Sequence, residues 1–162
     1  SALDDAAVQT GVTWDATFFA PDFFLNRFAD QESTAWGYAV NYVSPSLGGC
    51  QYQLQPGDDV LWAADFFGGP PDYAQKTLLR LDGPAKASVN APLRVVVTDG
   101  TTHAPVAGAA VGGTVTGADG SASVTLGTPG VVSLKAEAPG AIRSKRGRVS
   151  ERVSRGSRAH RR

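Results

Sequence analysis

The residues that could support acid–base, nucleophilic or metal chemistry are few and scattered along the chain. The two histidines, His103 and His160, have no second His, Cys or carboxylate at metal-ligand spacing, and the sequence has no HExxH, GxSxG or phosphate-loop motif. A catalytic nucleophile would have to recruit one of these histidines as its base. We therefore predict exposed loop histidines, and a protein that is not an enzyme and has no catalytic residue, metal site or cofactor.

Two pairs of adjacent carboxylates, Asp58-Asp59 and Asp4-Asp5, are the nearest approach to a catalytic acid pair. Neighbouring residues on a strand point to opposite faces, so Asp58 and Asp59 would not converge on one substrate. Asp4 and Asp5 suit the start of a helix. A calcium site that uses Asp58, Asp99 or Asp119 is the alternative, but Asp-Gly and Gly-Asp steps are common in turns without any ion.

Aromatic doublets are the most distinctive feature that could bind a ligand. In a strand, each doublet places one ring inward and one outward. The doublets are Phe18-Phe19, Phe23-Phe24 and Phe66-Phe67. We expect a contact surface for a ligand, glycan or protein partner, with Phe19, Phe23 or Phe24, Phe67 and Tyr42 as its candidate residues. The alternative is that a neighbouring domain or a missing N-terminal strand covers these rings.

Cys50 is the only cysteine. In a cytosolic protein it would be an ordinary buried thiol, whereas in an exported protein a lone cysteine implies a partner outside this chain.

The region around residues 36–66 must position most of these side chains. Two strand-like runs, Trp36–Val43 and Asp59–Phe66, flank a turn at 55–58 whose sequence, Gln-Pro-Gly-Asp, predicts type II geometry. Alternation places Val60, Trp62, Ala64 and Phe66 on one face. We predict that Trp36 and Trp62 are core rings packed across the sheet.

A short helix is expected before this region. Ser1 is a candidate N-cap and Gly11 a candidate helix end. The alternating residues from Val12 to Phe18 predict a strand, and Phe23–Phe28 predicts either another strand or a half-turn of helix.

The central motif carries a family resemblance. It consists of Gly37-Tyr38-x-x-Asn41, a Gly-bearing loop, and Tyr52-x-Leu54-x-x-Gly57-Asp58-x-Val60-x-Trp62. It resembles a domain of unknown function related to the C-terminal β-domain of transcobalamin and intrinsic factor. The resemblance implies a β-grasp-like domain over residues 1–67, in which the structural residues are Trp36, Asn41, Gly57, Asp58 and Trp62.

The same resemblance bears on the ligand and on the edge of the sheet. In the transcobalamins the counterpart domain packs over one face of a bound cobalamin, but no residue here matches a known cobalamin ligand, and Tyr42 replaces the family's glycine. The family has an N-terminal hairpin before the helix that this chain lacks. An edge strand would then be unpaired and open to pairing with another chain.

Aromatic usage divides the chain into two domains. Every Trp, Tyr and Phe lies between Trp14 and Tyr73, and the apolar residues that follow are Val, Ala, Leu and Ile. We therefore expect one core built from rings and another from small or branched side chains. A Gly/Pro-rich linker at residues 68–75 separates them.

Seven short strands are expected in the second domain, at residues 76–149. Their number and regular turn spacing predict an antiparallel sandwich. The expected strands are Leu78–Leu81, Ala85–Val89, Leu93–Thr98, Ala109–Val115, Ser121–Leu126, Val131–Ala138 and Ile142–Val149. The motifs at 94–99, 104–111 and 116–124 resemble carboxypeptidase-regulatory-like and bacterial Ig-like repeats. This resemblance implies a spacer or an interaction surface, without catalysis.

The chain end is strongly basic. From Arg143 onward there are nine basic residues and one acidic residue, about +8, so residues 1–142 carry about −8 in a chain of zero net charge. Three interpretations stay open: a polybasic arm for an anionic surface, a disordered end, or sequence translated out of frame. We predict a basic disordered tail at residues 150–162, with no folded strand beyond about Val149, no specific binding and no nucleic-acid partner.

These patterns favour a mainly β fold with one short helix, a β-grasp-like domain followed by an Ig-like sandwich. No apolar run is long enough to span a membrane, and we expect a start codon, any signal peptide and a preceding strand to lie outside this chain. The predicted function is non-enzymatic binding or display by an exported protein, secreted or at an actinobacterial cell surface, with a protein, glycan or cell-wall partner. The alternatives are a cobalamin-like small-molecule binding domain with the sandwich as spacer, and an accessory region of a larger secreted enzyme.

Overall fold

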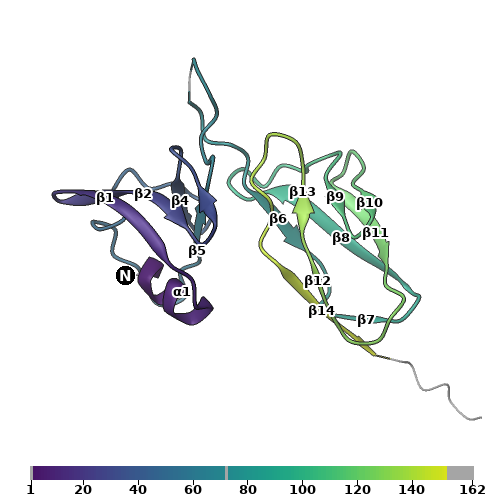
Figure 1. Ribbon diagram of the computed structural model, residues 1–162. Helices are drawn as coiled ribbons and strands as arrows, with labels where there is room; N and C mark the ends of the chain where they lie inside the picture. Colours follow the sequence, from purple (N-terminus) through teal and green to yellow (C-terminus); the bar gives the residue numbers. More distant parts are fainter. Residues whose placement is uncertain (1, 72, 153–162) are drawn as a thin grey trace, which may run out of the picture. The chain divides into compact units, whose positions relative to one another are not determined.

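The protein is mainly β, with a single short helix and several antiparallel sheets, as the sequence predicts (Figure 1). The computed structural model describes residues 2–71 and 73–152. The chain divides into two compact units, Ser1–Thr77 and Leu78–Arg162, called here unit 1 and unit 2. Among the described residues, no helix has the length and apolar character needed to cross a membrane.

Unit 1 opens with helix α1, Ala2–Thr10. Leu3 and Ala7, four residues apart and therefore on one face, are its buried residues. Gly11 ends the helix in the left-handed conformation (φ 69°), as predicted. The indole Nε1–H of Trp14 donates to Asp4 Oδ1 at 3.0 Å, which ties the helix to the strand that follows.

The next element is an antiparallel hairpin of β1, Trp14–Phe19, and β2, Asp22–Phe28, joined by residues 20–21. β2 includes the segment for which the sequence left open a half-turn of helix, and it is a strand. The short strand β3, Gln31–Glu32, pairs with the other side of β2, so β1 lies at an edge of its sheet.

Strands β4, Gly37–Val40, and β5, Val60–Ala63, form the second sheet of unit 1. Both are shorter than predicted. Asn41 and Tyr42 (φ 51° and 67°) end β4, and Asp65 (φ 52°) breaks the alternation after β5. Phe66 is nevertheless fully buried, because its ring packs over Gly37, where an added Cβ would lie 2.5 Å from the ring.

The turn before β5 has the predicted hydrogen bond, from Asp58 N–H to the Gln55 carbonyl at 3.0 Å. Gly57 takes a φ of 94° at its third position, as type II geometry requires.

The described part of unit 2, residues 78–152, contains nine short strands. They are β6 Leu79–Asp82, β7 Lys86–Ser88, β8 Pro92–Asp99, β9 Ala110–Val111, β10 Thr114–Val115, β11 Ser121–Thr125, β12 Val131–Leu134, β13 Ala136–Glu137 and β14 Gly147–Arg152. They form three sheets in the orders β11-β8-β6, β12-β14-β7 and β10-β9-β13. The predicted strand Ala109–Val115 is a hairpin instead, because Gly112 and Gly113 both take positive φ between β9 and β10.

The core of unit 2 consists of small and branched aliphatic side chains. Its buried members are Leu79, Leu93, Val95, Val97, Ala109, Val111, Ala122, Val124, Leu134, Ala136 and Val149. Along β8 the buried residues Leu93, Val95 and Val97 alternate with more exposed ones, so one face of the strand supplies the core.

The predicted end of the folded chain needs correction. The last strand was expected over Ile142–Val149, with a tail from residue 150, but β14 spans Gly147–Arg152. Ser150, Glu151 and Arg152 pair in parallel with β7, which gives backbone partners to residues whose polar side chains suggested disorder. The remainder of the predicted tail, residues 153–162, lies outside the described residues.

Candidate functional site

A continuous series of aromatic rings crosses unit 1 from the hairpin β1–β2 to the sheet β4–β5. Phe18, Trp14 and Phe23 contact one another with ring centroids 5.8–6.3 Å apart. Phe23 stacks on Trp62 at 5.9 Å, and Trp62 stacks on Tyr38, its register partner, at 4.9 Å. Tyr52 meets Tyr38 edge-on at 6.5 Å.

A pocket of about 340 Å³ opens along this series. Its aromatic walls are Phe23, Tyr38, Tyr52 and Trp62, and the other lining residues are Leu3, Gly49, Cys50, Leu54 and Val60. Helix α1, strands β2, β4 and β5 and the long loop between β4 and β5 all contribute. The pocket therefore depends on the assembly of the whole unit.

Asp22 holds the loop that carries Gly49 and Cys50. Its side chain is buried. Oδ1 accepts the backbone N–H of Cys50 at 3.2 Å, and Oδ2 accepts the side-chain amide of Gln51 at 3.2 Å. Gly48 is required beside it, because an added Cβ would collide with the Asp22 carboxylate. A buried carboxylate with several donors thus fixes one wall of the pocket.

Tyr38 is the best anchored ring of the pocket. Its hydroxyl donates to the Leu47 carbonyl at 2.6 Å. Burial raises the pKa of Tyr38 above its ordinary value of 10.0, and the charge of Asp22 and the nearby Tyr52 raise it further. The ring is therefore neutral and fixed, and it presents a stacking face to the pocket.

Cys50 lines the pocket, and it is an exposed, free cysteine. Since it is the only cysteine in the sequence, the chain forms no internal disulfide.

The predicted contact residues lie at different places in unit 1. Phe23 is half-buried and lines the pocket. Phe19 and Phe24 are exposed and stack on each other at 4.5 Å on the β1–β2 hairpin. Phe67 lines a separate and more open pocket with Tyr73, and Tyr42 is half-buried in the left-handed conformation that ends β4.

Two expectations about rings are wrong. Phe18 was expected to point inward opposite Phe19, but 70% of it is exposed, and its ring contacts only partly covered rings, those of Trp14 and Phe23. Trp36 and Trp62 were expected to be core rings packed across the sheet. Both are half-buried, and the ring across from Trp62 is Tyr38. The indole of Trp36 instead donates to the Asn26 carbonyl at 3.1 Å.

Asn41, Gly57 and Asp58 join the end of β4 to the turn before β5. Asn41 Nδ2 donates to Asp58 Oδ1 at 2.7 Å, and Asn41 Oδ1 accepts the backbone N–H of Asp59 at 3.0 Å. Asp58 Oδ2 also accepts the backbone N–H of Gln55 at 2.8 Å.

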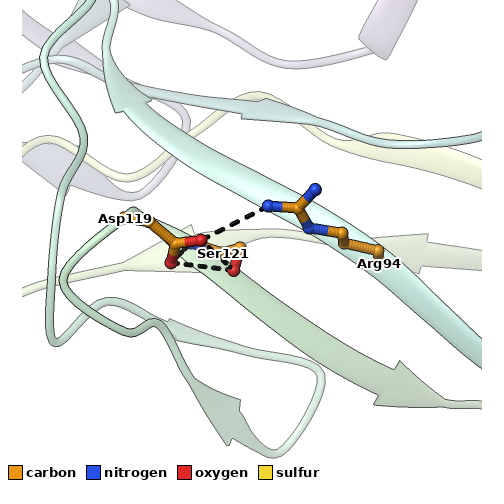
Figure 2. A network of polar contacts seen from close by, with 3 residues as sticks. All are labelled: Arg94, Asp119 and Ser121. Atoms are coloured by element: carbon orange, nitrogen blue, oxygen red, sulfur yellow. Dashed lines mark hydrogen bonds and ion pairs between the residues drawn. The ribbon is translucent and has the colours of Figure 1, made fainter.

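The other aspartates considered as calcium ligands close turns in unit 2. Asp99 accepts the backbone N–H of Thr101 at 2.8 Å. Asp119 accepts the N–H and the hydroxyl of Ser121 and contacts Arg94 at 3.3 Å (Figure 2). The Ser121 bonds, chiefly the one from its backbone, and Arg94 hold the pKa of Asp119 below its usual 3.8. Within the described ranges, His, Cys, Asp and Glu form no group of three suited to a metal ion.

Of the two histidines, His103 is exposed in a turn, with its backbone N–H donated to the Asp99 carbonyl at 2.8 Å. His160 falls outside the described part of the chain.

Sequence reasoning missed four residues of the site: Leu3, Asp22, Tyr38 and Tyr52. The period-two alternation along β4 could have shown that Tyr38 shares a face of the sheet with Trp62, its cross-strand partner. Asp22 gave a weaker signal, as the single acidic residue of β2, a strand rich in aromatic residues. Tyr52 belongs to the motif at residues 52–62, but the motif did not mark it as a pocket residue. Leu3 gave no signal, because it reaches the pocket through a contact between distant segments.

Comparison with protein-family models, with curated proteins and with solved structures finds no match to this chain.

Proposed function

We propose that the protein is a non-enzymatic binding protein and that its ligand binds in the aromatic pocket of unit 1. The observation that carries this proposal is the pocket of about 340 Å³ walled by Phe23, Tyr38, Tyr52 and Trp62. Pockets that bind small molecules or single groups of larger ligands begin at about this size and are lined mainly by apolar and aromatic side chains.

The lining also indicates the chemistry of the ligand. The polar side-chain groups of the lining residues are the two tyrosine hydroxyls, the Cys50 thiol and the Trp62 indole N–H, and the Tyr38 hydroxyl already donates to Leu47. Flat ring faces and few polar groups favour a flat or apolar group over a charged one. The ligand is a protein, glycan or cell-wall component that inserts such a group.

Unit 2 serves in this proposal as the spacer that presents unit 1. The motifs of the two units support a transcobalamin-C-terminal-like β-grasp domain followed by an Ig-like sandwich, and the mainly β structure is consistent with both. The same resemblances support export to the surface of an actinobacterial cell.

A second candidate is a small-molecule binding protein of cobalamin-related type. The observation in its favour is that the pocket is a half-open concavity and not a flat patch, which suits a whole small ligand or one face of a larger one.

Retention of the full chain on cell-wall material, on glycans and on immobilised cobalamin tests both candidates. Tyr52→Ala removes one pocket wall and is expected to weaken retention at least tenfold, about 1.4 kcal/mol. Phe67→Ala is the matched control, since that exposed ring lies outside the aromatic pocket.

Equal retention of Tyr52→Ala and the parent would exclude the pocket as the binding site. A loss confined to Phe67→Ala would move the site to the second, more open pocket. Tight binding of cobalamin that Tyr52→Ala abolishes would favour the second candidate over the first.

A further inference from the structure

Unit 2 carries a group of two exposed arginines and one half-buried lysine where β12 meets β13, and this group is independent of the aromatic pocket. We call Lys135, Arg143 and Arg146 the cationic cluster. Lys135 lies between the buried residues Leu134 and Ala136, so alternation turns its side chain outward.

The opposing segment brings the two arginines to the same place. Ser144 is buried and makes two hydrogen bonds with Ala136. Its backbone N–H donates to the Ala136 carbonyl at 2.9 Å, and its hydroxyl oxygen accepts the Ala136 N–H at 2.8 Å. Gly147 pairs with Leu134. Residues 145–146 therefore lie opposite Lys135, and Arg143 and Arg146 are both exposed.

The cluster has an excess of positive charge. Burial lowers the pKa of Lys135, and the charges of Arg143 and Arg146 lower it further, while Glu137 acts in the opposite direction. Three cations thus stand near one carboxylate. Among the described residues of unit 2, the ion pairs are Arg80–Asp82 and Arg94–Asp119, and neither includes a member of the cluster.

The sequence around the cluster extends the same charge. Residues 143–152 contain five basic residues and one acidic residue, and the chain up to residue 142 is net acidic. Such a concentration of one sign favours a partner with many negative charges in a row.

The composition of unit 2 narrows the class of partner. No Phe, Trp or Tyr follows Tyr73, so unit 2 has no phenyl, phenol or indole ring on which a nucleobase could stack. Arginine binds phosphate oxygens through two parallel N–H donors, and two of the three cluster residues are arginines. We propose that the cationic cluster is a docking surface for a linear polymer of phosphate groups that carries no bases.

Long-chain inorganic polyphosphate is the probe, and its affinity for the full chain is measured over a range of salt concentrations. The triple variant Lys135→Gln, Arg143→Gln, Arg146→Gln is expected to bind at least tenfold more weakly. Its log–log salt slope should fall by about 2, since each lost phosphate contact lowers the slope by somewhat less than 1.

Two variants with the same loss of charge serve as controls. One changes Lys76, Arg80 and Arg94 to Gln, and the other changes Arg155, Arg158 and Arg161 to Gln. Both should retain most of the affinity. Equal losses in all three variants would show a response to net charge alone, and a loss only in the second control would assign binding to the chain end; either result overturns the proposal.

Single-stranded poly(dT) is measured in parallel as a polymer with bases. Weaker binding of poly(dT) than of polyphosphate at equal phosphate concentration is expected. Tighter binding of poly(dT) would contradict a surface without base contacts.

Discussion

The two units use different side chains for their cores and differ accordingly in what they leave exposed. The core of unit 2 consists of Val, Leu and Ala side chains that are almost completely buried, whereas unit 1 has a series of half-buried rings with an open pocket beside it. Branched aliphatic side chains pack closely between sheets, since each strand contributes one apolar face. Large rings leave concave surfaces when loops of different length meet them. The comparison indicates that unit 1 is suited to bind a ligand in a pocket, whereas unit 2 has a closely packed core.

Phe66→Ala should give the largest effect in unit 1. The fully buried ring packs over Gly37, so its removal leaves a cavity and should cost about 3–5 kcal/mol. All three tryptophans lie in unit 1, so tryptophan fluorescence during denaturation follows this unit. The neighbouring and partly exposed Phe67 provides the control, and Phe67→Ala should cost less than about 1 kcal/mol. Similar losses for both variants would show that exposure does not distinguish the rings of unit 1.

Asp22→Ala should cost about 2–3 kcal/mol, because the N–H of Cys50 and the amide of Gln51 lose a buried acceptor. Chemical denaturation measures the loss, and the rate of alkylation of Cys50 should rise as its loop loosens. Asp15→Ala removes an exposed carboxylate that accepts from Asn26, and it should change stability by no more than about 0.5 kcal/mol. An unchanged alkylation rate in Asp22→Ala would mean that the loop holds its position without the carboxylate.

Tyr38 should make unit 1 sensitive to alkaline pH. Its pKa is raised in the folded state, so its stabilising contribution is complete below 10.0 and is lost as pH rises through the folded pKa. Between pH 9 and 11, the melting temperature of Tyr38→Phe should therefore fall by less than the melting temperature of the parent. Tyr73→Phe changes an exposed ring and should follow the parent. Parallel curves for all three proteins would contradict the role given to Tyr38.

Asp119 should give the smallest effect, at the opposite end of the pH scale and in unit 2. Its folded pKa is lowered, so its contribution is present above 3.8 and is lost as pH falls through the folded pKa. As pH falls below 3.8, the melting temperature of Asp119→Asn, followed by circular dichroism, should fall by less than that of the parent. Glu137→Gln is the control and should follow the parent. If Glu137→Gln also loses less melting temperature than the parent, the turn in Figure 2 has no special role.

The sequence predicted local features better than the pocket. Gly11, the turn at Gly57 and the strand predicted over Leu93–Thr98 depend on neighbouring residues, and each appears as expected. The strand ends were harder to predict, because Asn41 and Asp65 adopt positive φ within patterns that would continue a strand. The pocket needs the register of Tyr38 with Trp62 and the approach of Asp22 to Cys50, which no local pattern encodes.

The position of β14 in its sheet has a consequence for the order of events during synthesis. β14 is the last of the described strands in the chain, yet it lies between β12 and β7 in the order β12-β14-β7. β7 pairs with residues more than 60 positions later, from Lys86 to Ser150, and contacts between such distant residues form slowly. Until the residues of β14 have been translated, β7 lacks its pairing partner. Every residue of unit 1 has by then been translated, so the aromatic pocket can assemble first.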